Sequence, residues 1–167
     1  MDLKKWILVL LALLVLCGCA APEELETVSD SYGDWIPTAG QIIVSLPGDA
    51  AEAVCGVPTG SLYFCDNYTV TVQTLPGGDL ERTLLAVTGY APERLTVLET
   101  RQGELDSFRT VWTAAGENGD QLGQAEILSD GNYHYVLCVM ASADIAAEYA
   151  DMWKVLFESF EVSYTAP

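Results

Sequence analysis

The clearest structural signal in this sequence is QLGQAEILSDGNYHYVLCVMA, residues 121–141. Two apolar runs, Gln121–Ser129 and Tyr133–Ala141, stand on either side of Asp130-Gly131-Asn132. Asp-Gly between apolar runs is a strong β-hairpin signal, because glycine readily adopts the positive φ that a tight turn needs. The second run is apolar on both faces from Tyr135 onward, which predicts a strand in the centre of a sheet.

Further strands precede this hairpin. The sequence predicts them at Ile42–Leu46, Ser61–Cys65, Asn67–Thr74, Leu95–Arg101 and Leu105–Ala115. Short turns at Gln102-Gly103-Glu104 and at residues 116–120 join the last two strands to each other and to the hairpin. Four consecutive strands linked in this way predict an antiparallel meander.

Two segments have helical character. Asp79 can cap a helix over Leu80–Thr88 that stops at Gly89. A second and longer helix is predicted to begin at Asp144, because apolar residues recur at helical spacing as far as Phe160. The predicted fold class is therefore α+β: an antiparallel sheet of about six strands, with a short helix and a long C-terminal helix packed on it.

The order of these elements resembles a known architecture. The Gly77-Gly78-Asp79 start of the first helix, Gly131-Asn132-Tyr133-His134-Tyr135 and Phe157-Glu158-Ser159-Phe160-Glu161-Val162 look like parts of the PsbP-like α/β/α sandwich. The resemblance covers residues 41–164. This fold is shared by photosystem accessory proteins, a nuclear transport factor and many small bacterial lipoproteins, and no catalytic motif belongs to it. The resemblance implies an accessory or binding role on a larger assembly.

The N-terminus has the layout of an export signal. Lys4 and Lys5 precede eleven apolar residues, Trp6–Leu16, and small residues follow. Leu16-Cys17-Gly18-Cys19 resembles the lipobox of bacterial lipoproteins, which implies that Cys19 is lipidated and that residues 1–18 are removed. The alternative is an uncleaved membrane-spanning helix, but Trp6–Ala21 offers sixteen uncharged residues, whereas a span needs about 20.

The expected organisation is a signal peptide over residues 1–18, an acidic tether over 19–38 and one globular domain over 39–167. The whole chain has 24 acidic and 7 basic residues, a formal charge of −17. Such a surface repels nucleic acid and anionic lipid headgroups, because phosphate binding needs clustered Lys and Arg. Nucleic-acid partners are therefore excluded, and the acidity favours solubility beside a membrane or a cationic partner.

Three cysteines, Cys55, Cys65 and Cys138, lie outside the signal. A hairpin centred on Gly60 would place Cys55 opposite Cys65, within reach of a disulfide that exported proteins can form. In the chain-entropy model this bridge would stabilise the fold by roughly 3 kcal/mol. The alternative is three buried free thiols.

Candidate chemistry centres on His134, the single histidine. It could act as a general base or a pH sensor, or it could simply pack at a strand end between Tyr133 and Tyr135. The acidic segments Glu117–Asp120 and Asp130–Asn132 do not follow a calcium-loop pattern, and turn formation explains them better. We predict no catalytic residue, no cofactor and no metal site.

These patterns favour a non-enzymatic lipoprotein that Cys19 anchors to the extracytoplasmic face of a bacterial cell membrane. The domain would bind a protein partner or a small ligand, with the loop system around Trp112–Asp120 as the contact region. The alternative is an envelope hydrolase or other enzyme whose site combines carboxylates with His134.

We expect protein extracted from the membrane to begin at a diacylglycerol-modified Cys19, as measured by mass spectrometry of the intact chain. Cys19→Ser should abolish the modification, whereas Cys17→Ser should keep it. An intact Met1, or a soluble and unmodified chain, would contradict lipid anchoring.

Overall fold

The computed structural model describes residues 38–53, 59–116 and 119–164, which belong to one compact unit beginning at Pro37. The predicted signal peptide, the lipidation site Cys19 and all but the last residue of the predicted tether lie outside the described residues and stay predictions. The strands are β1 (Gln41–Ile43), β2 (Ala51–Glu52), β3 (Gly60–Phe64), β4 (Tyr68–Pro76), β5 (Val97–Gln102), β6 (Leu105–Gly116), β7 (Gly119–Ser129), β8 (Tyr133–Ser142) and β9 (Glu161–Ser163). The helices are α2 (Leu80–Thr88) and α3 (Ala150–Glu158), with 3-10 turns η1 (Pro92–Arg94) and η2 (Ala146–Tyr149).

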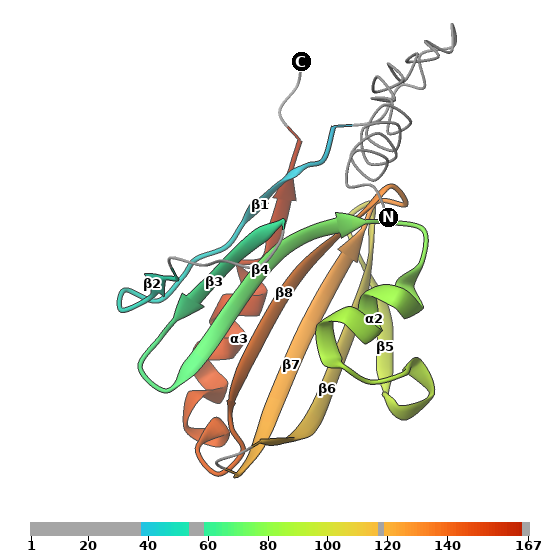
Figure 1. The fold of residues 1–167 in the computed structure, drawn as a ribbon. Helices are drawn as coiled ribbons and strands as arrows, with labels where there is room; N and C mark the ends of the chain where they lie inside the picture. The colour runs from blue at the N-terminus through green and yellow to red at the C-terminus, as the bar shows by residue number, and fades with distance from the viewer. Residues whose placement is uncertain (1–37, 54–58, 117–118, 165–167) are drawn as a thin grey trace, which may run out of the picture. The chain divides into compact units, whose positions relative to one another are not determined.

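Seven strands form one antiparallel sheet in the order β2-β3-β4-β8-β7-β6-β5 (Figure 1). The predicted meander is confirmed, because β5, β6, β7 and β8 pair in sequence. The predicted central strand is also confirmed: β8 is fourth of the seven, and most of its residues are buried. The strand is apolar on both faces because protein covers both of its faces.

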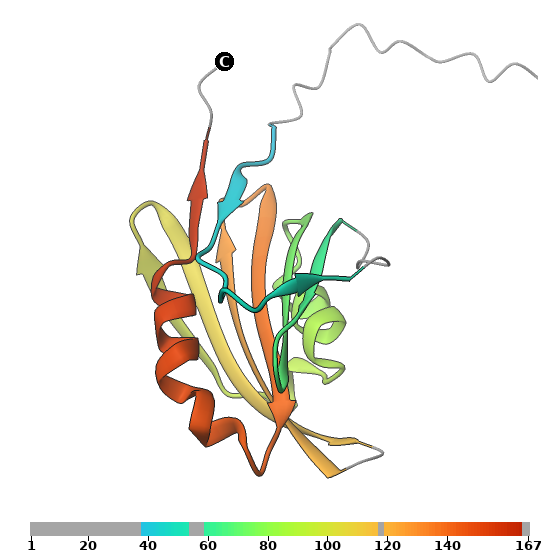
Figure 2. The same cartoon turned by 90° about the vertical axis from the view of Figure 1, so that its left-hand side faces the viewer.

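The two helices cover opposite faces of this sheet, as Figure 2 shows. Leu156, Phe157 and Phe160 place α3 and the segment after it on one face, in a core shared with Val70 and Leu137. On the other face, α2 inserts Leu84 into a second core, whose buried residues are Leu84, Trp112, Ala125, Ile127, Val136 and Cys138. The structure is therefore a three-layer α/β/α arrangement with a hydrophobic core on each side of the sheet.

Helix α2 has the predicted bounds. The Asp79 carboxylate accepts a hydrogen bond of 2.9 Å from the main-chain N–H of Arg82, which satisfies one of the unpaired donors at the helix start. Gly89 ends the helix in the left-handed conformation, with a φ of 74°. Local sequence alone therefore sets both ends of this helix.

Two strand predictions are wrong in detail. The sheet has seven strands rather than about six, because Ala51–Glu52 adds to the edge of β3. The first predicted strand is shorter than Ile42–Leu46 and leaves the main sheet, since Gln41–Ile43 pairs with β9 in a separate two-stranded ribbon. Beyond Ile43, the main-chain N–H of Ser45 donates to the Ser159 hydroxyl at 2.9 Å instead of to a strand.

The long C-terminal helix is also a wrong prediction, because α3 spans nine residues. Asp144 does not cap it: its carboxylate accepts a hydrogen bond from the Ser142 hydroxyl, and no side chain caps the 3-10 turn that follows. The chain therefore passes through a turn and Ala146–Tyr149 before the α-helix begins at Ala150. Within the described part of the chain, neither helix has the length and apolar character needed to cross a bilayer.

The Asp130 carboxylate connects the β7–β8 turn to both ends of the domain. Its Oδ1 accepts hydrogen bonds from the main-chain N–H groups of Asn132 (2.9 Å) and Tyr133 (2.7 Å). Its Oδ2 accepts from the hydroxyls of Tyr135 (2.8 Å) and Tyr164 (2.9 Å). Burial alone would raise the pKa of Asp130, but these hydrogen bonds outweigh burial and lower it.

We expect Asp130→Asn to lower the free energy of unfolding at pH 7 by about 1–3 kcal/mol, because the amide cannot accept all of these bonds. The folded-state pKa of Asp130 is lowered, so its contribution is present above the unfolded value of about 3.9 and is lost as the pH falls through the folded value. Urea unfolding of the wild type and of Asp130→Asn, from pH 7 down through the folded-state pKa of Asp130, measures the difference in their free energies of unfolding.

The matched control is Asp106→Asn, because Asp106 forms an exposed ion pair with Arg101 at 3.5 Å. Such a pair contributes less than about 1 kcal/mol. If Asp130→Asn and Asp106→Asn lower the free energy of unfolding equally at pH 7, the hydrogen bonds of Asp130 do not stabilise the β7–β8 turn.

Candidate functional site

His134 lies inside the protein and not in an open site. It is buried between β8 and α2, and its Nδ1 lies 2.7 Å from the hydroxyl of Thr83. Burial lowers the pKa of His134, although the charges of Asp130 and Asp79 oppose this effect. The imidazole therefore stays neutral near pH 7 and connects the helix to the sheet.

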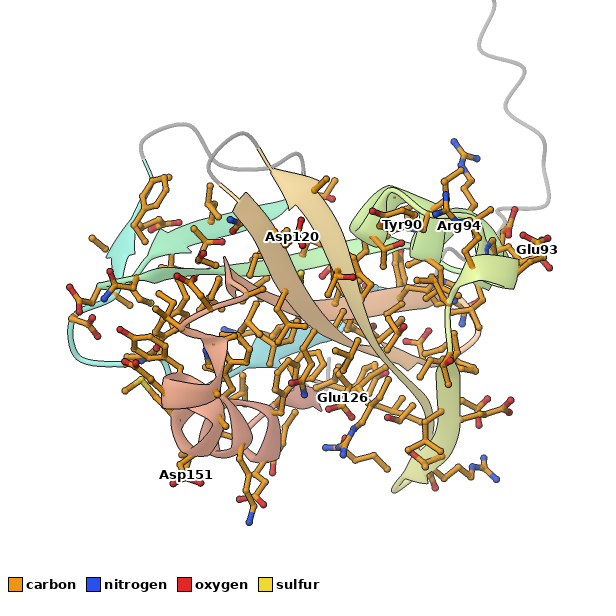
Figure 3. The ribbon with its side chains drawn as sticks, turned by 90° about the horizontal axis from the view of Figure 1, so that it is seen from below. Tyr90, Glu93, Arg94, Asp120, Glu126 and Asp151 are labelled. Carbon is orange, nitrogen blue, oxygen red and sulfur yellow. The ribbon has the colours of Figure 1, made fainter. Side chains whose placement is uncertain are left out.

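A buried carboxylate, Glu126, is a feature that the sequence interpretation missed. Glu126 is fully buried in β7, and its Oε1 accepts a hydrogen bond of 2.8 Å from the Ser107 hydroxyl. The Arg109 guanidinium, half-exposed on the neighbouring strand, contacts the same oxygen at 3.0 Å, whereas Oε2 has no described hydrogen-bond partner. Figure 3 shows Glu126 on the same side of the sheet as Asp151 of α3.

One sequence signal could have indicated Glu126, namely a single acid within the apolar run Ala125–Leu128. Its partner could not be found in this way, because Arg109 is opposite Glu126 only through the β6–β7 register. A buried charge needs a nearby opposite charge, so this pair explains how β7 tolerates the carboxylate.

The cysteines are placed differently from the expectation. Cys65 and Cys138 are free thiols in the part of the chain that the structure describes. Cys55 lies outside the described residues, so the Cys55–Cys65 disulfide stays a prediction. The register expected for it is wrong, however: Ala51 pairs with Phe64, which centres the β2–β3 connection before Gly60 and not on it. Burial raises the pKa of Cys138 to about 12.

The predicted contact region divides into a buried and an exposed part. Trp112 is only 6% exposed and belongs to the α2-side core, so it is not part of an exposed loop. Its ring lies over Gly123, directly opposite on β7, where a Cβ atom would overlap the indole. Asp120 is exposed near the start of β7, and residues 117–118 lie outside the described residues. The role of Asp120 in partner contact stays a prediction.

An open groove of about 380 Å³ lies beside this tryptophan. It lies where the β5–β6 pairing stops, after the last pair, Val97 with Thr110; the Thr110 hydroxyl still donates a hydrogen bond of 3.1 Å to the Thr96 carbonyl. Its lining residues come from the segment after α2 and from β6 and β7: Tyr90, Arg94, Leu95, Thr96, Val111, Trp112, Thr113 and Leu122. The volume lies within the range of about 300–1,000 Å³ that is usual for ligand clefts.

The groove exposes a strand edge. β6 pairs with β7 as far as Gly116, but with β5 only as far as Thr110. The β5–β6 hairpin closes through Gln102 and Leu105, so alternate residues from Leu105 direct their main-chain groups toward β5. The same alternation places the N–H and C=O groups of Val111, Thr113 and Ala115 on the open edge. No described strand pairs with them there.

Arg94 is the one charged side chain that lines this groove. Its guanidinium lies 4.9 Å from the centre of the Tyr90 ring, which is a cation–π contact. Figure 3 shows Tyr90 and Arg94 together beside Glu93, on the far side of the sheet from α3. Among the described residues, the ion pairs involve Arg101, Arg109 and Lys154, but not Arg94.

Comparison with known proteins gives similarity of structure alone. No protein-family model and no curated protein matches the sequence. Cyanobacterial PsbP (CyanoP) from Synechocystis sp. PCC 6803 superimposes with a TM-score of 0.52 at 10% identity, covering 77% of this chain and 95% of that one. The fold is PsbP-like. The resemblance expected from the sequence is confirmed at the level of the fold.

Two other solved structures have a fold similar to that of this chain. LpqN of Mycobacterium tuberculosis, described as involved in cell envelope biogenesis, has a TM-score of 0.52 at 15% identity, covering 80% of this chain and 88% of LpqN. A protein from Bacteroides thetaiotaomicron VPI-5482 has a TM-score of 0.51 at 14% identity, covering 74% of this chain. This chain spans 45% of the Bacteroides protein. At these identities the likeness establishes the fold and leaves the function open.

We expect the free energy of unfolding to fall as the pH drops below about 6.5, the ordinary pKa of histidine. The folded-state pKa of His134 is lowered, so as the pH falls the unfolded chain binds a proton at a higher pH than the folded chain does. Proton binding therefore favours the unfolded state in this range. His134→Gln should flatten this part of the pH profile, as measured by urea unfolding between pH 7.5 and 5.5. Since the chain has no second histidine, an unchanged slope would show that His134 is not held neutral.

Proposed function

We propose that this protein is a lipid-anchored accessory protein of the bacterial cell envelope and acts by binding a protein partner. The lipobox-like Leu16–Cys19 segment supports anchoring outside the cytoplasm. The structural likeness to LpqN, a protein described as involved in cell envelope biogenesis, agrees with this compartment. The proposal takes no partner from LpqN, because the likeness extends to the fold alone.

The observation that carries a binding role is the groove beside the unpaired edge of β6. Val111, which lines the groove, is 55% exposed, and Leu98, opposite Arg109 on β5, is 60% exposed. Apolar side chains at an open strand edge are suited to contact with another protein. This surface adjoins the region that the sequence indicated, but it consists of strand and groove and not of loops.

The enzyme alternative is less well supported by the placement of its residues. His134 contacts Thr83 inside the α2 interface, and Glu126 contacts Ser107 and Arg109 on the opposite face of the sheet. Each group has a structural role in its own layer. No three described His, Cys, Asp or Glu side chains gather in a way that could hold a metal ion.

Crosslinking in living cells tests the binding role. A photo-crosslinking amino acid at Val111 should form a covalent adduct with one defined protein, seen as a discrete shift on a gel. Val155 on α3 is the matched control, because it is also a valine and is 60% exposed. We expect no adduct at Val155. Equal labelling at both positions, or none at Val111, would contradict a specific partner at the groove.

A further inference from the structure

We propose that the open edge of β6 accepts an extended segment of the partner as an additional β-strand, and that Arg94 binds a carboxylate of that segment. This inference rests on the proposed function and deepens it, because it states how the partner is recognised. Main-chain hydrogen bonds would supply the affinity, and the groove side chains would supply the selectivity.

The edge of β6 lacks the features that usually prevent strand addition. Proteins protect exposed edges with charged residues, with proline, or by keeping the edge strand very short. β2, at the other end of the sheet, has two residues, and β5 carries Glu99 and Arg101. The overhang of β6, Val111–Gly116, reads VWTAAG and contains neither a charge nor a proline. It is therefore chemically suited to pair with another strand.

The groove gives the added strand a place to lie. The strand pairing of β5 with β6 stops at Thr110, although the Thr110 hydroxyl still donates a hydrogen bond of 3.1 Å to the Thr96 carbonyl. Beyond that bond, Leu95 and Thr96 line the groove together with Val111 and Thr113. A strand entering there would reach the N–H and C=O groups of three alternate residues, Val111, Thr113 and Ala115. Alternate residues of a strand point to opposite faces of a sheet. On each face, every second side chain of the added segment would therefore contact the side chains of β6 beside it.

The charge of the groove indicates the chemistry of the segment. Acidic residues outnumber basic ones by 24 to 7 in this chain, yet the single charged residue that lines the groove is a cation. Contact with the Tyr90 ring orients the Arg94 guanidinium and leaves its N–H groups available for an anion. A planar guanidinium binds a carboxylate through two parallel hydrogen bonds, so an Asp, a Glu or a C-terminal carboxylate fits this position.

A second copy of this chain could also pair at the edge, but electrostatics disfavour it. Each molecule carries a formal charge of −17, so two copies repel each other as they approach. The occupant that fits best is therefore a different protein, with an uncharged β-forming segment that carries one carboxylate.

Peptide binding tests this inference with the full mature protein in detergent. The probe is the fluorescein-labelled peptide Ser-Val-Thr-Val-Thr-Val-Asp with an amidated C-terminus, and its partner probe is the same amidated peptide ending in Asn. A generic β-forming sequence suffices, because main-chain groups supply the affinity. We expect the carboxylate peptide to bind about fivefold more tightly by fluorescence anisotropy, the scale of an exposed ion pair. N-methylation of the peptide at alternate residues should abolish binding.

Arg94 and Arg82 form no ion pair among the described residues, so variants of the two provide a matched pair. Arg94→Gln should reduce binding of the carboxylate peptide to that of the Asn peptide. Arg82→Gln, on the exposed face of α2, should leave both unchanged. Hydrogen exchange should show new protection at the amides of Val111, Thr113 and Ala115 when the peptide is added. Equal binding of the two peptides, an unaffected Arg94 variant or no new protection would each overturn the inference.

The outcomes separate this inference from the proposed function. If Val111 crosslinks to one protein in cells but neither peptide binds, strand addition is wrong and the binding role stands. If the amides of β6 are protected without peptide, and the protection rises with protein concentration, the occupant is a second copy and the inference is overturned.

Discussion

The Asp130 carboxylate is the constraint on which the rest of the structure depends. By accepting two main-chain N–H groups it fixes a tight turn, and the turn sets the register of β7 against β8. A shift of one residue would move every side chain of β8 to the other face. Its second oxygen holds Tyr135 and Tyr164, and the Tyr135 hydroxyl accepts a hydrogen bond from the main-chain N–H of Gly40 at 2.8 Å. One side chain thus connects the central hairpin with segments beside β1 and β9, far apart in sequence.

This register gives the two faces of the sheet different roles. Even-numbered residues of β8, such as Val136 and Cys138, pack toward α2, whereas Leu137 and Val139 pack toward α3. His134 and Glu126, the two buried ionisable groups that attract a catalytic interpretation, fall on opposite faces for the same reason. His134 meets Thr83 of α2, and Glu126 meets Ser107 and Arg109. The sheet that separates them also gives each one its own structural partner.

The open edge of β6 is a consequence of unequal strand lengths. β6 spans twelve residues and β5 six, so half of β6 extends past its neighbour. The segment before β5 does not pair with this edge as a strand: Thr96 accepts a hydrogen bond from the Thr110 hydroxyl, and Tyr90, Arg94 and Leu95 line a groove beside β6. The side chains of this overhang are small or apolar, apart from the hydroxyl of Thr113. A binding surface in this protein is therefore formed by main-chain groups left unpaired, and not by a cluster of reactive side chains.

Local patterns in the sequence were sufficient for the meander, for both ends of α2 and for the central place of β8, because turns, caps and apolar periodicity depend on neighbouring residues. They were not sufficient for the length of the C-terminal helix, because the Asp144 carboxylate accepts a hydrogen bond from Ser142 instead of capping the helix. They were also not sufficient for the burial of Trp112, because its ring lies over Gly123 on the adjacent strand. The Glu126–Arg109 pair and the groove at β6 likewise depend on which residues lie opposite each other. The sequence alone determined the elements and their order, and only the tertiary structure decided the pairs and the open edge, since both follow from strand register and from how far each neighbouring strand extends.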